Sequence, residues 1–382
     1  MAKSWDEIEQ TEGFAGARAV SARQVEPVLS RVKAPPGDPQ AQLKSLSKFM
    51  IVPFFLFGAT FFATDMFLPD NGFWIFIQFL LFPVLFLLFM GTGLFLARNK
   101  IAEVFVEAQV RLGHKADAIR AMVAPLGLTF VPAPGGAPKG LEWIAKQSWA
   151  PAVLRDAEKT LNEAGGMDEA VAAARDAGLL IAANVHVVGT PEQKKLYAEQ
   201  AAGMMQLEDG FQGTRRGIRF DMFEWVEKVS EAPDVFHLVI VMEAPLRLHG
   251  VTQMRARKTG WPAHPGEPVL QDVDLGPRAF DALYRLRASD QVEARALFNP
   301  AVIERVIDLS HGGKFRAVAR GGYLVFDFES ETNRFQIVDL MTGAWSDETV
   351  RATYSDIAEA LALVDTLAHA FMVAKNSDTG GA

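Results

Sequence analysis

The sequence predicts an α+β fold with a transmembrane two-helix hairpin, a helical stalk and insert, and a β-rich cytoplasmic domain that ends in a helix. Two long apolar stretches lie close together within residues 49–97, and neither holds a Lys or Arg. Aromatic and β-branched residues become frequent from about residue 209, and an apolar stripe at helical spacing precedes the C-terminus. The expected units are a cytoplasmic N-terminal segment (1–48), the hairpin (49–97), the stalk and insert (98–206), the β-rich domain (207–376) and a disordered tail (377–382).

The hairpin is predicted from the length of its uncharged stretches. Residues 73–97 hold no charge over 25 residues, and about 20 apolar residues are enough for a helix to cross a hydrocarbon core of about 30 Å. Phe49 and Leu68 bound the first expected span, and Phe73 and Ala97 bound the second. Two alternatives remain, a hairpin buried in a water-soluble core and a hairpin that dips into one leaflet.

The charges beside the hairpin predict its orientation. Lys and Arg flank both expected spans and are absent from the connecting loop, and such flanks stay in the cytoplasm. The sequence therefore predicts a two-pass protein of the inner (plasma) membrane, with the lipid bilayer as a partner and both termini cytoplasmic. The flanking residues are Arg31, Lys33, Lys44, Lys48, Arg98, Lys100, Arg111 and Lys115.

Composition excludes several classes of function. The net charge of −8 argues against a nucleic-acid partner, which would require a basic face. The absence of cysteine removes disulfides, thiolate nucleophiles and cysteine-ligated zinc. The sequence has neither a phosphate-binding Gly-Lys-Ser/Thr loop nor a Gly-x-Ser-x-Gly elbow, so no cofactor is predicted.

Helices are predicted after the hairpin. Apolar residues keep helical spacing beyond Arg98, so the second membrane helix is expected to continue as a stalk. Residues 140–206 are predicted to be mainly helical. Gly165 and Gly166 separate two alanine-rich segments there, and Thr190 is a helix start signal. Residues 179–188 could form a strand instead.

The β-rich domain is predicted to contain strands at 218–229, 235–242, 269–275, 280–286 and 335–340, and a hairpin of 315–319 with 323–328. One helix is expected between Asn299, as its cap, and the glycines at 312 and 313. A C-terminal helix is predicted from one apolar stripe, which consists of Ile357, Leu361, Val364, Ala368 and Phe371.

The sequence Tyr-Arg-Leu-Arg-Ala-Ser-Asp-Gln-Val-Glu-Ala-Arg at 284–295, followed by Asn-Pro-Ala-Val-Ile-Glu-Arg at 299–305, resembles the core motif of a bacterial membrane family. That family is catalogued as domain of unknown function 3137. The resemblance extends over about 45–130 and 205–340, whereas residues 140–200 do not match and are read as an insertion. It implies two membrane passes and a cytoplasmic α+β domain, and it implies no reaction.

Asp290, Glu293 and Arg295 form the candidate site of this motif. On a strand, Glu293 and Arg295 would share one face, and Arg295 could bind an anionic group. The alternative is a structural ion pair that fixes the junction before the helix capped by Asn299. No catalytic, cofactor-binding or metal-binding residue is predicted.

The remaining polar candidates have simple alternatives. His237 lies in an apolar strand and is expected to be a core histidine, and Asp272 and Asp274 are expected to meet only solvent. The histidines lack the paired spacing of a zinc protease; they are His114, His186, His237, His249, His264, His311 and His369. Basic clusters would attract anionic lipid if they faced a bilayer, or would be ordinary loop charges; they comprise Arg215, Arg216, Arg219, Arg247, Arg255, Arg257 and Lys258.

Two functions follow as hypotheses. The first is a membrane-anchored cytoplasmic interaction or scaffold module with a protein partner or a second copy of the chain, because the sequence has no recognisable catalytic constellation. The alternative is a membrane-associated enzyme that uses the region from Asp290 to Arg295.

Overall fold

A computed structural model of the protein describes most of the chain. The described residues are 2–32, 51, 53–60, 62, 72–134, 137, 139–163, 166–178, 205–228, 233–257, 269–275, 278–311, 313–339 and 342–379.

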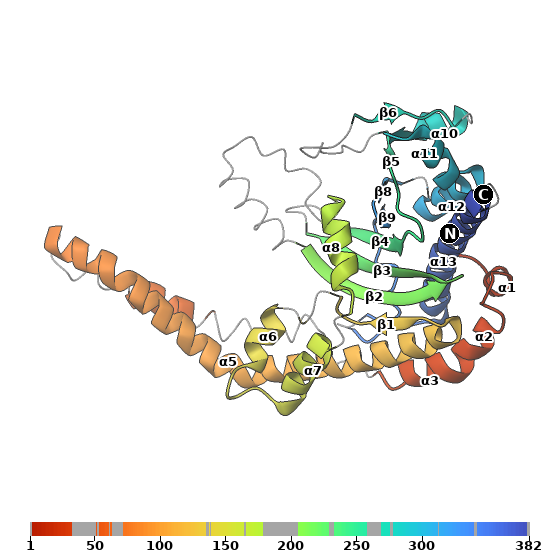
Figure 1. Ribbon diagram of the computed structural model, residues 1–382. Coiled ribbons are helices and arrows are strands. Elements are labelled where there is room, and N and C mark those ends of the chain that lie inside the picture. The colour runs from red at the N-terminus through yellow and green to blue at the C-terminus, as the bar shows by residue number, and fades with distance from the viewer. Residues whose placement is uncertain are drawn as a thin grey trace.

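One large antiparallel sheet organises the fold (Figure 1). Its nine strands run in the order β1-β2-β3-β4-β9-β8-β5-β7-β6. Two-residue turns with positive φ at Arg216, Gly217 and Gly321 close the hairpins β2–β3 and β8–β9, as short antiparallel connections require. The strands are β1 (Thr129–Val131), β2 (Met205–Arg215), β3 (Ile218–Glu227), β4 (Val235–Glu243), β5 (Val251–Ala256), β6 (Gln271–Asp272), β7 (Tyr284–Ala288), β8 (Phe315–Arg320) and β9 (Tyr323–Ser330).

One face of the sheet lies under helices and forms the main core. Side chains alternate between the two faces along each strand, so one row of directly paired residues across six strands is apolar and buried. This row, the apolar row, consists of Met222, Ile240, Phe326, Ala317, Met254 and Leu286. The helices of this layer include α11 (Gln291–Leu297), α12 (Pro300–Ser310) and α13 (Asp347–Thr379).

The N-terminal segment joins the same layer. It forms α1 (Trp5–Glu9), α2 (Ala17–Val20), a π turn (Ser21–Val25) and α3 (Glu26–Leu29). The rings of Trp5 and Phe14 pack edge-on against Tyr354 of α13, with centroids 5.4 and 6.5 Å away. Aromatic contacts of this kind add to the burial term, and they attach the start of the chain to its last helix.

The opposite face carries α8 (Asp168–Asp176), which packs on β4 and β9 over a smaller apolar cluster. Three shorter elements complete the described helices: α6 (Lys139–Ala145), α7 (Ala152–Glu163) and α10 (Arg278–Leu283). Figure 1 shows α6 and α7 beside α5 (Gly72–Val123), a helix of 52 residues that ends in a short 3-10 turn (Ala124–Leu126).

The C-terminal part of the long helix α5 lies beside the sheet, and its N-terminal part projects away from it (Figure 1). Near its C-terminal end, Lys115 forms an ion pair with Asp209 of β2, and both side chains are buried. The predicted continuation of a helix beyond Arg98 is confirmed, because no break separates residues 97 and 98.

The predicted transmembrane hairpin is contradicted. In the part of the chain that the structure describes, no helix combines the length and the apolar character that crossing a bilayer requires. The expected two-pass inner-membrane location is contradicted by the same finding.

The error in the hairpin prediction has a physical source. The prediction rested on the scarcity of charge in 49–68 and 73–97, and a scarcity of charge does not establish how much of the resulting helix is apolar. The second stretch lies in α5, whose C-terminal half carries charged residues and packs beside β1. The two stretches do contact each other, because the ring of Phe57 packs edge-on against Phe86 and Phe89.

Within the β-rich domain, the strand at 235–242, the hairpin of β8 with β9 and the helix capped by Asn299 are confirmed. Three strand predictions are wrong or reduced. Residues 269–275 contribute only β6, residues 280–286 divide between α10 and β7, and residues 335–339 form turns whose Phe335 and Ile337 are buried without strand pairing. Burial in an irregular segment produces the same apolar pattern as a strand.

Several predictions concern residues outside the described part of the chain. These are the break at 34–39, most of the turn at 69–72, the segment at 179–188, the helix start at Thr190 and the last three residues of the tail. The described part of that tail differs from the prediction, since α13 continues to Thr379.

Candidate functional site

A buried charged cluster lies on the α8 face of the sheet. His237 Nδ1 lies 2.8 Å from Asp327 Oδ1, and Arg316 donates to Asp327 Oδ2 at 2.7 Å. All three side chains are almost fully buried, and Trp225 stacks on the His237 ring at 3.9 Å. The expectation that His237 is a core histidine is confirmed.

The charges in this cluster support one another. Burial alone would lower the pKa of His237, but the negative charges of Asp327 and Glu227 raise it to about 9. Burial would likewise raise the pKa of Asp327, and the charges of His237 and Arg316 bring it below its ordinary value instead. At neutral pH the cluster is therefore an ionised group of two cations around one carboxylate.

Arginines continue from this cluster across the sheet. Directly paired residues of β3, β4, β9, β8, β5 and β7 form one row on the α8 face, the charged row. It consists of Phe223, Val239, Asp327, Arg316, Arg255 and Arg285. Like charges directly opposite each other on a sheet repel, so three adjacent arginines require anionic neighbours.

Two of the three arginines have such a neighbour within the fold. Arg316 is bound to Asp327, and Arg285 takes both oxygens of Asp272, at 2.7 and 2.8 Å. Arg255, between them, makes no hydrogen bond or ion pair with any other residue that the structure describes. Burial and the charges of Arg285 and the nearby Arg287 lower the pKa of Arg255, and the opposing charge of Asp272, which is bound to Arg285, does not offset them.

A cleft of about 650 Å³ opens on the same face, between α8 and the turn from β8 to β9. Its α8 wall carries the carboxylates of Glu169 and Asp176, and its sheet wall carries Arg320 and Tyr323. Within the described part of the chain, the α8 face thus combines a buried ionised cluster, an arginine without an ion pair and a cleft of mixed charge.

The side-chain carboxylates of Asp290 and Glu293 accept hydrogen bonds from backbone amides. Asp290 caps α11 and accepts from the amides of Val292 and Glu293, at 2.9 and 3.0 Å. Glu293 accepts from the amides of His249 and Gly250, at 2.8 and 3.2 Å. The two carboxylates therefore hold the junction between the loop before β5 and the start of α11.

Arg295 lies apart from these contacts. It donates to the backbone and side-chain oxygens of Gln291 within α11, at 3.3 and 3.2 Å. Because Glu293 and Arg295 lie on a helix rather than a strand, residues two apart point to different sides. The structure does not bring the three predicted residues into one group.

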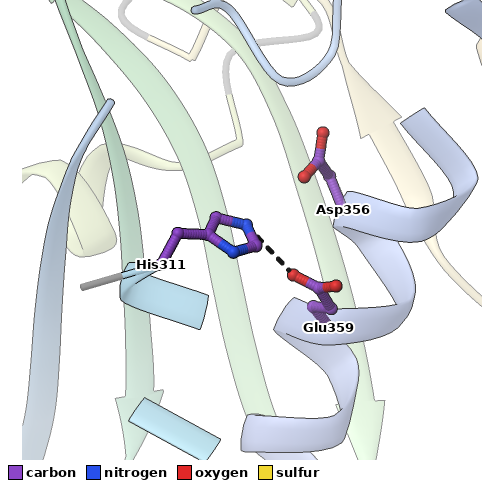
Figure 2. Close-up of side chains that lie close together, drawn as sticks. All are labelled: His311, Asp356 and Glu359. Carbon is purple, nitrogen blue, oxygen red and sulfur yellow. Dashed lines mark ion pairs between the residues drawn. The ribbon is translucent and has the colours of Figure 1, made fainter. Parts of the chain in front are cut away.

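A second cluster lies on the other side of the sheet, where α12 ends beside α13. His311 Nε2 is 3.4 Å from Glu359 Oε2, and Asp356 lies one turn before Glu359 (Figure 2). Burial lowers the pKa of His311 and raises that of Asp356 to about 7. The donor set of one imidazole and two carboxylates is one that could hold a divalent metal ion.

Sequence reasoning missed most of these residues. The expectation that Asp272 meets only solvent is wrong, since it pairs with Arg285. The alternation of arginine with apolar residues at 284–287 was the sequence signal for the charged row. It places the two arginines on one face of a single strand, but it does not identify the strands that lie beside it. His311 and Asp356 are far apart in sequence, and only the packing of α12 on α13 joins them.

The fold and these sites define an α+β protein built on one nine-stranded antiparallel sheet. Residues 237–369 match the sequence profile of a family described as Protein of unknown function (DUF3137), which supports the resemblance of the motif at 284–305. The match begins in β4 and ends within α13, so it does not include residues 45–130 or 205–236, where the resemblance was also expected.

Two further comparisons add little. No curated protein matches the chain. Among solved structures, the crystal structure of the mycobacterial trehalose monomycolate transport factor A, TtfA, is similar at 14% identity and a TM-score of 0.24, over 42% of this chain and 74% of that one. A likeness at this level supports no conclusion about fold or function.

Proposed function

We propose that this protein is an interaction module that binds a carboxylate-rich segment of a partner protein through the charged row of its sheet. The observation that carries the proposal is Arg255. It lies directly between Arg285 and Arg316, and unlike them it forms no hydrogen bond or ion pair with a carboxylate of the described residues.

The chemistry of the guanidinium group selects the ligand. Arginine presents a planar fork of donors that matches a carboxylate, and charge-assisted pairs of this kind are stronger than neutral hydrogen bonds. Asp272 already binds Arg285 in this way within the fold, at 2.7 and 2.8 Å. An Asp or Glu side chain from a partner would give Arg255 the same kind of contact.

The contacts of the motif at 290–295 favour binding over catalysis. The carboxylates of Asp290 and Glu293 each accept two backbone N–H groups, which gives both residues a structural role at the start of α11. The enzyme alternative therefore gains no support from this region, whereas the partner-binding proposal does not depend on it.

The test uses a fluorescein-labelled peptide of alternating aspartate and glutamate, with fluorescence anisotropy on the full-length protein at low salt. We expect saturable binding that weakens at least tenfold in Arg255→Gln and also weakens as salt is added. Arg155→Gln, at an exposed arginine of α7 away from this face, is the matched control and should bind as the wild type does.

Two results would overturn the proposal: no saturable binding of the acidic peptide, or equal affinity in the Arg255 and Arg155 variants. Sedimentation velocity of the same proteins separates the source of the acidic segment. Self-association that Arg255→Gln abolishes would identify the partner as a second copy of this acidic chain, and a monomer that binds the peptide would support a different protein.

A further inference from the structure

The cluster at the end of α12 carries an inference independent of the proposed function. Asp356 and Glu359 lie three residues apart on α13 and therefore share one side of that helix. His311 ends α12 in the left-handed conformation, with φ of 49°, and its ring is directed toward Glu359 (Figure 2). One ligand atom from each residue lies within 4.8 Å of the other two.

Glu359 is buried with an unpartnered oxygen. Its side chain is 9% exposed, and Oε2, the oxygen that faces His311, has no hydrogen-bond partner. Buried polar atoms are nearly always bonded, and each exception requires an explanation. The exposed fraction of the His311 side chain is 48%, so an ion could reach this oxygen from solvent.

Among the described residues, the side chains of Lys3 and Arg334 border the cluster as cations. Lys3 Nζ lies 3.7 Å from Glu359 Oε1, and Arg334 NH1 lies 3.5 Å from Asp356 Oδ1. Neither contact is a hydrogen bond, and the Arg334 guanidinium donates instead to the carbonyl of Leu309. The rival reading is therefore an ion-pair cluster, in which these cations alone balance the two carboxylates.

We propose that His311, Asp356 and Glu359 bind a divalent transition metal ion of the zinc class. Imidazole and carboxylate suit Zn²⁺, which they bind at about 2.0–2.2 Å. Bonds of this length require the three ligand atoms to move closer than 4.8 Å, and the half-exposed His311 side chain has room to move. Three protein ligands leave a fourth position for water, and the ion would join the end of α12 to α13.

The experiment titrates Zn²⁺ into chelator-treated full-length protein by isothermal titration calorimetry, with circular dichroism as a check on folding. We expect one ion per chain, and affinity at least tenfold weaker in both His311→Gln and Glu359→Gln. His369→Gln and Glu348→Gln change exposed residues of the same helix and should leave the affinity unchanged. Co²⁺ bound in place of Zn²⁺ should give visible absorption bands in the wild type that His311→Gln removes.

An absence of saturable binding would overturn the proposal in favour of the ion-pair cluster. Equal loss of affinity in the control variants would overturn it too, because the ion would then bind elsewhere on the surface. If Glu359→Gln fails to fold, His311→Gln decides the question, since its half-exposed side chain can be replaced without opening the core. None of these measurements involves the charged row, so the two proposals succeed or fail separately.

Discussion

Adjacent residues of β9 separate two contrasting regions of the sheet. Phe326 belongs to the apolar row, whose six paired residues are all buried beneath helices. Asp327, the next residue, belongs to the charged row, in which one carboxylate is followed by three arginines. Six strands thus keep the same pairing on both faces while the chemistry changes completely.

The contrast shows on which face of the sheet the protein bears the free-energy cost of burying charged groups. Apolar burial stabilises the helix-covered face without any specific partner, whereas the buried charges of His237, Arg316 and Asp327 on the α8 face depend on specific ionic neighbours. A charged row is a poor way to stabilise a sheet, and the binding role proposed above would account for it. The following experiments are ways to break or refine this comparison.

The largest effect should come from Asp327→Ala. The substitution leaves Arg316 buried without its anion and leaves His237 with only Glu227, 3.7 Å away. Breaking a buried pair in this way typically costs about 3–5 kcal/mol. Urea unfolding at pH 7 measures the loss. Asp308→Ala, at an exposed carboxylate on α12, is the control and should stay within about 0.5 kcal/mol of the wild type. A loss below 1 kcal/mol for Asp327→Ala would mean that the cluster is not a coupled unit.

Replacing the whole cluster should recover the loss. A triple variant with His237→Phe, Arg316→Met and Asp327→Leu replaces all three buried charged side chains with apolar ones, and such replacements are often neutral or stabilising by about 1–4 kcal/mol. The same urea experiment applies, with the acidic-peptide assay alongside. A triple variant as unstable as Asp327→Ala would show that the packing around the cluster, and not its charge, limits stability.

A pH-dependent effect should distinguish the faces. Burial raises the pKa of Glu224, on the helix-covered face, from 4.5 to about 8. Its contribution to stability is then fully present below pH 4.5 and is lost as the pH rises through 8. Asp327, whose pKa is lowered by His237 and Arg316, contributes stability above its ordinary 3.8 that is lost in stronger acid.

Thermal melts between pH 5 and pH 8 measure the Glu224 effect. We expect the Tm of the wild type to fall with rising pH over this window and the fall to become smaller in Glu224→Gln. His237, with its pKa raised to about 9, adds a further loss that begins above 6.5 and is unaffected by that substitution. An unchanged slope in Glu224→Gln would contradict the assignment.

The smallest expected effect is a gain in folding stability in Arg255→Gln. Arg255→Gln removes a cation that lies directly opposite Arg285 and Arg316, and relief of like-charge repulsion across a sheet amounts to about 0.2–1 kcal/mol. Chemical denaturation should therefore show Arg255→Gln to be slightly more stable than the wild type, although it binds the acidic peptide less well. A destabilised variant would indicate that Arg255 has an internal partner after all.

Local signals predicted part of this fold. Asn299 and Pro300 defined the start of α12, and the glycines between β8 and β9 defined a hairpin, because caps and turns depend only on nearby residues. The strand β5 and the helix α11 were missed, since short elements hold too few residues for periodicity to be read.

The sites were less accessible to sequence reasoning. The charged row depends on strand order, which places β5 between β8 and β7, and no local pattern contains that order. Asp290 and Glu293 attracted attention as a motif, but their bonds to distant or neighbouring amides could not be read from it. The transmembrane prediction failed because hydropathy records only the apolar composition along the sequence. It does not establish how long or how apolar the helix formed by those residues is.

The attachment of the N-terminal segment to α13 affects how the molecule is made. The Lys3 amide donates to Ser355 Oγ across 352 residues of sequence, and Arg351 donates to the Lys3 carbonyl at 2.6 Å. During synthesis on the ribosome, the segment around Lys3 must wait until α13 has been translated before it can dock. Deleting either α1 or α13 would therefore remove the surface against which the other packs.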